Sequence, residues 1–175
     1  MLYALLKMLV SISFNLLNKV LGGGLPPFGS TAVVVEQDNR YLVVELPRGK
    51  LVFPGGFMKW HEKPAQTAKR EGKEETGLDL DIAQLINIYS STSKNMFKMS
   101  TICFVYRANV LGGKLRKNME GTPRWLTEEE IRTRFDAFSL VLLEDYLHFR
   151  EIHWDATTSQ WTGTPSTVSA GFISL

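Results

Sequence analysis

The feature that most restricts the fold of this chain is an acidic segment that ends at Gly77. The segment has a proline where a helix would begin and a glycine just beyond its last turn, so the spacing predicts a helix over residues 64–76. On such a helix Glu71, Glu74 and Glu75 occupy positions i, i+3 and i+4 and share one face. Like charges at this spacing repel by about 0.2–0.5 kcal/mol per pair. The chain therefore needs cations beside this face.

Two sources of positive charge are available to these carboxylates. Arg70 can reach Glu74 on the same helix and Glu62 in the preceding loop. A divalent ion is the stronger offset, because Mg²⁺ and Mn²⁺ prefer carboxylate oxygens and Mg²⁺ bridges them to substrate phosphates. A plain solvated acidic face is the alternative interpretation.

The spacing of the segment from Gly56 to Leu78 carries more information than its charge. It resembles the signature of the Nudix hydrolase family, G-x5-E-x7-R-E-U-x-E-E-x-G-U, in which U is a bulky aliphatic residue. Eight of the nine specified positions match. The exception is Gly72, where the family has an aliphatic residue. The resemblance implies the Nudix fold, an α/β fold with a mixed β-sheet between helices, over about residues 30–150.

The resemblance also implies a reaction and a set of site residues. Members hydrolyse a nucleoside diphosphate linked to another moiety, using Mg²⁺ or Mn²⁺ to neutralise the diphosphate and to activate water. Carried over by position, the catalytic residues are Glu62, Arg70, Glu71, Glu74 and Glu75. The implied metal ligands are Gly55, Glu71, Glu74, Glu75 and, outside the signature, Glu120. Arg70 and Glu62 are expected to orient the ligands. For Glu120, an exposed loop acid is an equal alternative.

The substrate is less well defined by the sequence. Arg48, Lys50 and Lys59 lie near the signature and are candidates for binding phosphate, with solvated surface residues as the alternative. Trp60 is a candidate for stacking on a base, with a packed loop aromatic as the alternative. The net charge of +2 suits an anionic small molecule but does not predict a specific nucleic-acid partner.

Gly72 and its neighbours make a separate prediction. With Ala65 and Ala68 it forms a face of small residues, which predicts close packing of the helix on a sheet. Alanine at position 72 should stabilise the chain by up to about 1 kcal/mol if a methyl group fits there. Strong destabilisation would instead indicate sheet or loop backbone against the helix.

Residues 1–21 form a predicted helix that is apolar apart from one stripe of Lys7, Ser11, Asn15 and Asn18. Three interpretations remain open: packing on the domain or on a second copy in a homodimer, association with a membrane surface, and a membrane span or signal segment. Lysine and asparagine make a span costly. We expect a cytoplasmic protein, with membrane association through this helix as the open alternative.

The rest of the chain divides into a Nudix domain, residues 25–152, and a Ser/Thr-rich tail, residues 153–175, that is expected to be mobile or loosely docked; residues 1–24 are the helix and its glycine linker. Hydrophobic patterning predicts strands over residues 31–37, 40–46, 50–53, 78–91, 97–110 and 122–127, and helices from residue 128 and over residues 137–149. Cys103 is expected to be a buried strand residue.

The leading functional hypothesis is therefore a divalent-metal-dependent pyrophosphohydrolase. The alternative is a Nudix domain that senses a nucleotide without hydrolysing it. The complete set of carboxylates in the signature favours the enzyme.

Overall fold

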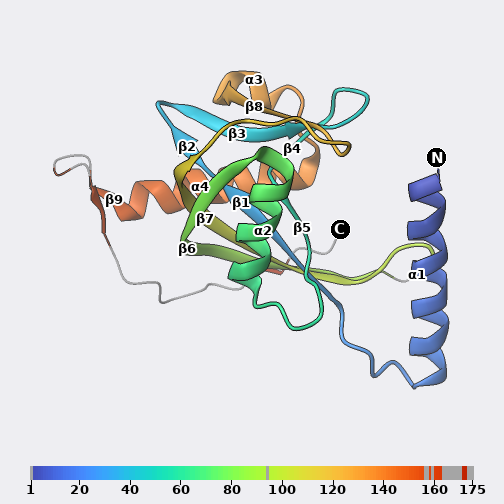
Figure 1. Cartoon of the computed structure of the whole chain (residues 1–175). Helices are drawn as coiled ribbons and strands as arrows, with labels where there is room; N and C mark the ends of the chain where they lie inside the picture. Colours follow the sequence, from blue (N-terminus) through green and yellow to red (C-terminus); the bar gives the residue numbers. More distant parts are fainter. Residues whose placement is uncertain (1, 94, 156–157, 159, 163–170, 173–175) are drawn as a thin grey trace.

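The computed structural model describes residues 2–93, 95–155, 158, 160–162 and 171–172 (Figure 1). Its helices are α1 (Leu2–Val20), α2 (Pro64–Thr76), α3 (Glu128–Arg132) and α4 (Ala137–His153). Its longer strands are β1 (Phe28–Val34), β3 (Arg40–Glu45), β6 (Leu78–Ser91), β7 (Thr101–Gly113) and β8 (Thr122–Thr127). The shorter strands are β2 (Glu36–Gln37), β4 (Leu51–Val52), β5 (Gly55–Phe57), β9 (Trp154–Asp155), β10 (Gln160–Trp161) and β11 (Gly171–Phe172).

The larger sheet has the order β11-β6-β7-β1-β5. It is mixed, because β1 runs parallel to β7 and antiparallel to β5. In the smaller sheet β3 pairs antiparallel with β2, β4 and β8. Asp38 and Asn39 form the turn between β2 and β3, and their φ angles of 52° and 57° suit the tight turn that joins two twisted strands.

Helices cover the strands on both sides, which confirms the predicted α/β architecture (Figure 1). Alternate residues of β1 point to opposite faces, as strand geometry requires. Val34 joins a core cluster with Leu142 and Leu143 of α4, whereas Val33 joins a second cluster with Ala68 of α2. Cys103 is buried in the α4 cluster, as predicted, and burial raises the pKa of its thiol to about 11.

Local signals gave both ends of α2 and the starts of α3 and α4 correctly. Helix α2 covers the predicted residues 64–76, and Gly77 ends it with a left-handed φ of 80°. The Thr127 hydroxyl accepts a hydrogen bond from the Glu130 backbone N–H, and the Glu130 carboxylate accepts one from the Thr127 N–H at 2.7 Å, so a capping box marks the start of α3 near the predicted residue 128. Helix α4 begins at Ala137 as expected and runs four residues beyond the predicted end, to His153.

Three predictions about individual segments were wrong. The strand expected over residues 31–37 is divided at Val35, because β1 belongs to the larger sheet and β2 to the smaller one. The strand expected from residue 97 begins at Thr101, and the preceding residues form a turn beside α1. Ala65 is exposed rather than on the packed face of α2, whose buried positions are Thr67, Ala68, Gly72, Glu75 and Thr76.

Much of the tail predicted over residues 153–175 lies outside the described residues, so its expected mobility is not tested. Its described parts form strands β9, β10 and β11. At the other end of the chain, α1 stands to one side of the domain (Figure 1). Among the described residues, no helix has both the length and the hydrophobicity that a membrane crossing requires.

Candidate active site

The acidic segment folds as strand β5, a loop and helix α2, and Arg70 joins these parts. The Arg70 Nε donates to Glu62 Oε1 at 2.6 Å, and its Nη2 donates to Glu62 Oε2 at 2.8 Å and to the Phe57 carbonyl at 3.1 Å. This paired geometry is the strong form of an arginine–carboxylate contact. The Arg70 guanidinium holds the pKa of Glu62 well below its usual range. Glu62 is therefore a fixed anion that positions Arg70.

Two further hydrogen bonds fix Glu62. The Thr67 hydroxyl donates to Glu62 Oε2 at 2.7 Å, and the Lys59 backbone N–H donates to the same atom at 3.0 Å. Sequence reasoning missed Thr67. Thr67 lies four residues before Glu71 on the predicted helix, and this spacing could have indicated that its hydroxyl lies near the carboxylates.

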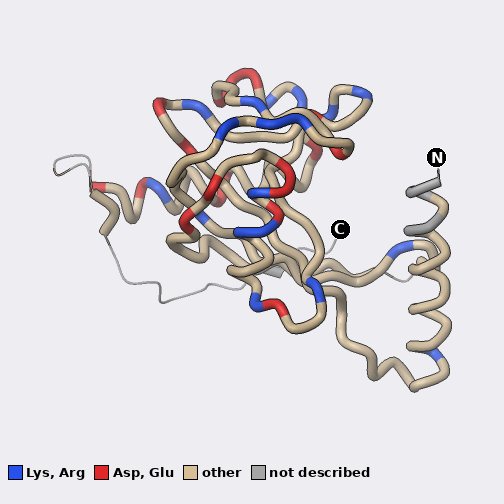
Figure 2. The backbone as a smooth tube through the Cα atoms, viewed as in Figure 1, with Lys and Arg blue, Asp and Glu red and all other residues tan. Residues whose placement is uncertain are grey.

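Arg70 also reaches the carboxylates of its own helix. Its Nη1 lies 2.6 Å from Glu71 Oε1 and 3.0 Å from Glu74 Oε2. The contacts of Arg70 with Glu62 and Glu74 that the sequence predicts are therefore present. Glu74 is half exposed and lies 3.7 Å from the Lys59 ammonium, whereas the Glu71 side chain is mostly covered. Figure 2 shows this alternation of basic and acidic residues along α2.

Glu75 differs from its neighbours because it is buried, with 6% of its surface exposed. Its Oε2 accepts a hydrogen bond from the Gly55 N–H at 2.8 Å. Burial, together with the nearby carboxylates of Glu71 and Glu120, raises the pKa of Glu75 to about 8. Two acids held together in a partly dry position require a proton or a cation between them. Near neutral pH, this position therefore favours a cation that displaces the proton.

Glu120 approaches this position from the loop before β8. Glu120 is exposed, and its carboxylate is one of the two that help to raise the pKa of Glu75. Asn118 holds the loop in place: its Oδ1 accepts from the N–H groups of Glu120 and Gly121, each at 2.9 Å, and its Nδ2 donates to the Glu74 carbonyl at 2.8 Å. Asn118 was not predicted, although asparagine commonly organises turns in this way.

Two glycines allow strand β5 to lie against these carboxylates. A Cβ added to Gly56 would lie 2.5 Å from the Glu71 carboxyl carbon. A Cβ added to Gly55 would lie 2.1 Å from the Thr31 carbonyl oxygen in the neighbouring strand β1. Both positions therefore exclude a side chain, Gly56 because of the site and Gly55 because of the sheet.

The remaining predicted residues lie in different places. Lys59 is beside Glu74, but Lys50 forms an ion pair with Asp136 at 2.6 Å, next to the start of α4. Arg48 is exposed in the loop between β3 and β4 and has a φ of 82°. Trp60 is 88% exposed, so it is not a packed loop aromatic.

The donor set fits a hard divalent ion by its chemistry, since it consists of carboxylates next to a buried acid with a raised pKa. Within the described part of the chain, no three acidic, histidine or cysteine side chains already converge as a metal cluster. Glu71 and Glu74 instead face Arg70. Binding an ion would therefore require these two side chains to turn away from the guanidinium.

The chain is similar in sequence and in structure to proteins that contain a NUDIX domain. The sequence model of the NUDIX domain matches residues 26–146. A MutT-like protein of Streptomyces ambofaciens is 30% identical over 125 residues, which cover 68% of this chain and 78% of that protein. An ADP-ribose pyrophosphatase of Methanocaldococcus jannaschii is 32% identical over 87 residues, 47% of this chain and 51% of its own length. A NUDIX hydrolase structure from Nitrosomonas europaea superposes with a TM-score of 0.63 at 28% identity and covers 70% of this chain and 90% of its own.

Proposed function

The chain belongs to the Nudix hydrolase family, and from that premise we propose that it hydrolyses the phosphoric anhydride bond of a nucleoside diphosphate linked to another moiety. Two observations support this substrate class. The signature is complete in its charged positions, and a relative with 32% identity carries the name ADP-ribose pyrophosphatase.

The arrangement of Glu75 and Glu120 carries the proposal. Glu75 is buried, and this burial, together with the nearby carboxylates of Glu71 and Glu120, raises the pKa of Glu75 to about 8. We assign this position to Mg²⁺ or Mn²⁺, with Glu71 and Glu74 as further ligands and the Gly55 carbonyl as a backbone ligand. When bound, the ion neutralises the diphosphate and lowers the pKa of a bound water.

The other residues of the site position these ligands. Arg70 is fixed by Glu62 and holds Glu71 and Glu74 beside β5, so the carboxylates are kept close to the strand before substrate arrives. Positioning residues of this kind commonly change metal affinity or activity by about 10–100-fold. The Lys59 ammonium is the basic group that we propose for contact with a substrate phosphate, because it lies 3.7 Å from Glu74.

The test is a screen of the purified full chain against nucleoside diphosphate sugars, dinucleoside polyphosphates and nucleoside triphosphates, with Mg²⁺ or Mn²⁺ and with a chelator. Chromatography of the products identifies the bond that is cleaved. The proposal predicts metal-dependent release of a nucleoside monophosphate or diphosphate from at least one substrate. Calorimetric binding of a nucleotide without product formation under all metal conditions would contradict hydrolysis and support a sensing module.

A further inference from the structure

Helix α1 places Ser11 and Asn15 of its polar stripe toward the domain and many of its apolar side chains outward. The Asn15 Nδ2 donates to the carbonyls of Met96 and Lys98 at 2.9 and 3.0 Å. Asn18 Oδ1 accepts from the Leu25 N–H at 2.9 Å, and Ser11 is buried. A helix on the surface of a globular domain normally has the opposite orientation, with its apolar side on the core.

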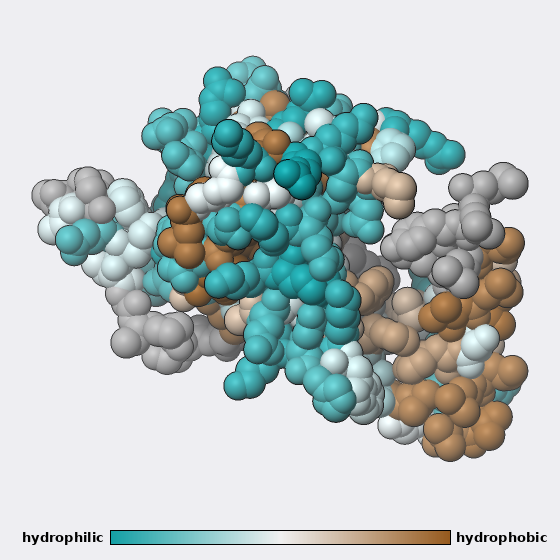
Figure 3. Space-filling view, viewed as in Figure 1, coloured by the Kyte–Doolittle hydropathy of each residue, from teal (hydrophilic) through white to brown (hydrophobic). Residues whose placement is uncertain are grey.

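The outward surface is also wider than one helix–helix contact needs. It consists of two rows of exposed side chains, namely Leu5, Leu9, Leu16 and Val20 in one row and Val10, Leu17 and Leu21 in the other, with exposures of 46–77%. Residues adjacent in sequence are about 100° apart around a helix, so the rows face different directions. Pairing with one helix of a second copy would cover a single narrow seam and leave the other row exposed. Figure 3 shows the continuous apolar surface on this helix.

The same part of the molecule carries only positive charge. Residues 1–35 contain two lysines and no acid, and residues 92–100 contain two lysines and no acid. The rest of the chain then has 16 basic and 18 acidic residues. Lys19 lies on α1 and Lys98 in the adjoining turn. Figure 2 shows basic residues and no acidic residues on the described parts of this helix and turn. This distribution is complementary to an anionic surface.

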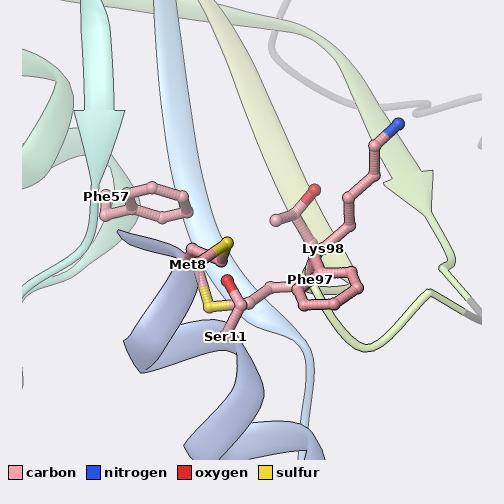
Figure 4. Close-up of a pocket in the computed structure, with 7 residues that line it drawn as sticks. Met8, Ser11, Phe57, Phe97 and Lys98 are labelled. Carbon is pink, nitrogen blue, oxygen red and sulfur yellow. The ribbon is translucent and has the colours of Figure 1, made fainter. Parts of the chain in front are cut away.

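Helix α1 does not pack closely on the domain along its whole length. A cavity of about 420 Å³ separates them, lined by Met8, Ser11, Phe57, Phe97 and Lys98 among others (Figure 4). Neither buried core cluster of the described residues includes a residue of α1. Phe97 is 57% exposed and adds an apolar side chain beside the helix. The helix is therefore attached to the domain by contacts such as the Asn15 hydrogen bonds and the packing of Phe14 on Phe28, and it is not one of the helices that cover the core.

We propose that α1 and the adjoining turn 96–98 form a docking surface for a lipid bilayer that contains anionic lipids. A helix that lies in the plane of a membrane buries its apolar side in the boundary between headgroups and acyl chains, and basic residues add attraction to anionic lipids. Such helices usually turn a charged face to water. Here Asn15 is hydrogen-bonded to the turn 96–98 and Asn18 to the linker residue Leu25, so the polar side of α1 is satisfied within the chain and needs no charged face.

The experiment is sedimentation of the full chain with vesicles of phosphatidylcholine alone and of phosphatidylcholine mixed with phosphatidylglycerol. We expect binding to the anionic vesicles that weakens as salt is raised. Replacing both Leu9 and Leu16 by glutamine should lower the vesicle-bound fraction by roughly tenfold or more. The matched control is Leu111→Gln on β7, which changes a side chain that is 67% exposed, and it should bind as the unchanged protein does.

A second variant tests the charge without altering the apolar surface. Replacing Lys19 and Lys98 by glutamine should reduce binding to anionic vesicles and its dependence on salt, whereas Lys114→Gln should not. Light scattering of each protein without lipid gives the oligomeric state. A dimer that the Leu9 and Leu16 changes convert to a monomer, without vesicle binding, would overturn the proposal in favour of a second copy. A monomer that binds neither kind of vesicle would also overturn it.

Discussion

Helices α1 and α2 have opposite arrangements of polarity relative to the same domain. In α2 the small side chains of Ala68 and Gly72 face the sheet, and charged side chains cover the outer side. In α1 the polar residues Ser11 and Asn15 face the domain, and leucines and valines face outward. The function of a surface helix therefore depends on what its outer side can contact as well as on how its inner side packs on the domain. The outer side of α2 suits water, ions and phosphate, and the outer side of α1 suits an apolar medium.

The two helices also differ in how their unusual face is supported. The carboxylates of α2 have partners within the chain, since Arg70 contacts three of the signature glutamates. The side chains in the outward apolar rows of α1 are 46–77% exposed. The signature helix is thus largely stabilised by its own domain, whereas the docking surface that we propose on α1 is to be covered by a contact outside the domain.

Loss of a carboxylate from α2 should have the largest effect. Replacing Glu74 by glutamine keeps the shape of the side chain but removes a charge that we assign to the metal ion. Because even residues that only position ligands commonly cost about 10–100-fold, a direct ligand should cost more than ~100-fold in turnover. Steady-state kinetics measure the change, and Glu151→Gln, an exposed acid on α4, is the control. Near-normal turnover in Glu74→Gln and Glu75→Gln would contradict the metal assignment.

Exchange of the guanidinium should have the next largest effect. Lysine at position 70 keeps the positive charge but cannot form the paired contact with Glu62 or reach the Phe57 carbonyl at the same time. We expect a loss of about 10–100-fold in turnover with a weaker apparent affinity for Mg²⁺. A Mg²⁺ titration of activity separates the two effects. If Arg70→Lys keeps full activity at low Mg²⁺, then Arg70 does not position the ligands.

The stability of the metal-free protein should depend on pH through Glu75. Its folded-state pKa of about 8 is above the ordinary value of 4.5, so the folded protein holds a proton that the unfolded chain releases. Stability contributed in this way is fully present at low pH and is lost as pH rises through this window. Thermal melts with a chelator should show a lower melting temperature at about pH 8 than at about pH 5, by roughly 3 °C or more. Glu75→Gln cannot release the proton and should reduce this difference.

Gly72 tests how closely α2 packs on the sheet. On an isolated helix, alanine would be favoured by roughly 1 kcal/mol. The structure leaves no room for the methyl group, because a Cβ at position 72 would lie 2.5 Å from the Cδ1 of Leu80, which is fully buried. The stabilisation that the sequence predicts for a site with room is therefore not expected, although the obstacle is a side chain rather than backbone.

Overpacking of a core commonly costs about 1–3 kcal/mol, so Gly72→Ala should lower the free energy of unfolding by about 1 kcal/mol. Urea unfolding measures the change. The double variant with Leu80→Val, which lacks the clashing carbon, should recover part of the loss relative to Leu80→Val alone. An additive double variant would show that Leu80 is not the obstacle.

Removal of residues 1–24 should have the smallest effect on the domain. The described contacts of α1 with the domain are peripheral, such as the Asn15 hydrogen bonds and the ring contact of Phe14 with Phe28 at 4.4 Å. The free energy of unfolding and the turnover of the truncated chain should therefore stay close to those of the full chain. An unfolded truncated chain would show that α1 belongs to the core and would remove the difference between the two helices.

The parts of the structure that sequence predicted well depend on local chemistry. Proline at the start of α2 and glycine at its end fix a helix within a few residues, so its boundaries were correct. The division of the first strand at Val35 depends instead on which sheet each half joins. Val33, Val34 and Val35 are all buried, and their apolar pattern reads as one continuous strand.

The site shows the same limit. The spacing identified the carboxylates, but it could not show that Glu75 is buried while Glu74 is half exposed. That difference arises because Glu75 lies on the side of α2 that faces β5, where the Gly55 N–H meets it. Lys50 was a reasonable candidate for phosphate, but a partner 86 residues away in sequence, Asp136, accounts for its position. In both cases the environment of the side chain depends on a contact with a segment that is distant in the sequence.

The parallel pairing of β1 with β7 also has a consequence for how the domain forms. Phe28 pairs with Thr101 and Val34 pairs with Arg107, so this central contact closes a loop of more than 70 residues. In the smaller sheet, Arg40 pairs with Thr127 across a still longer stretch. Loop closure has to precede the gain from such contacts, which slows folding. Neither sheet can be completed from the first half of the chain, so we expect the two sheets to assemble in one late, cooperative step.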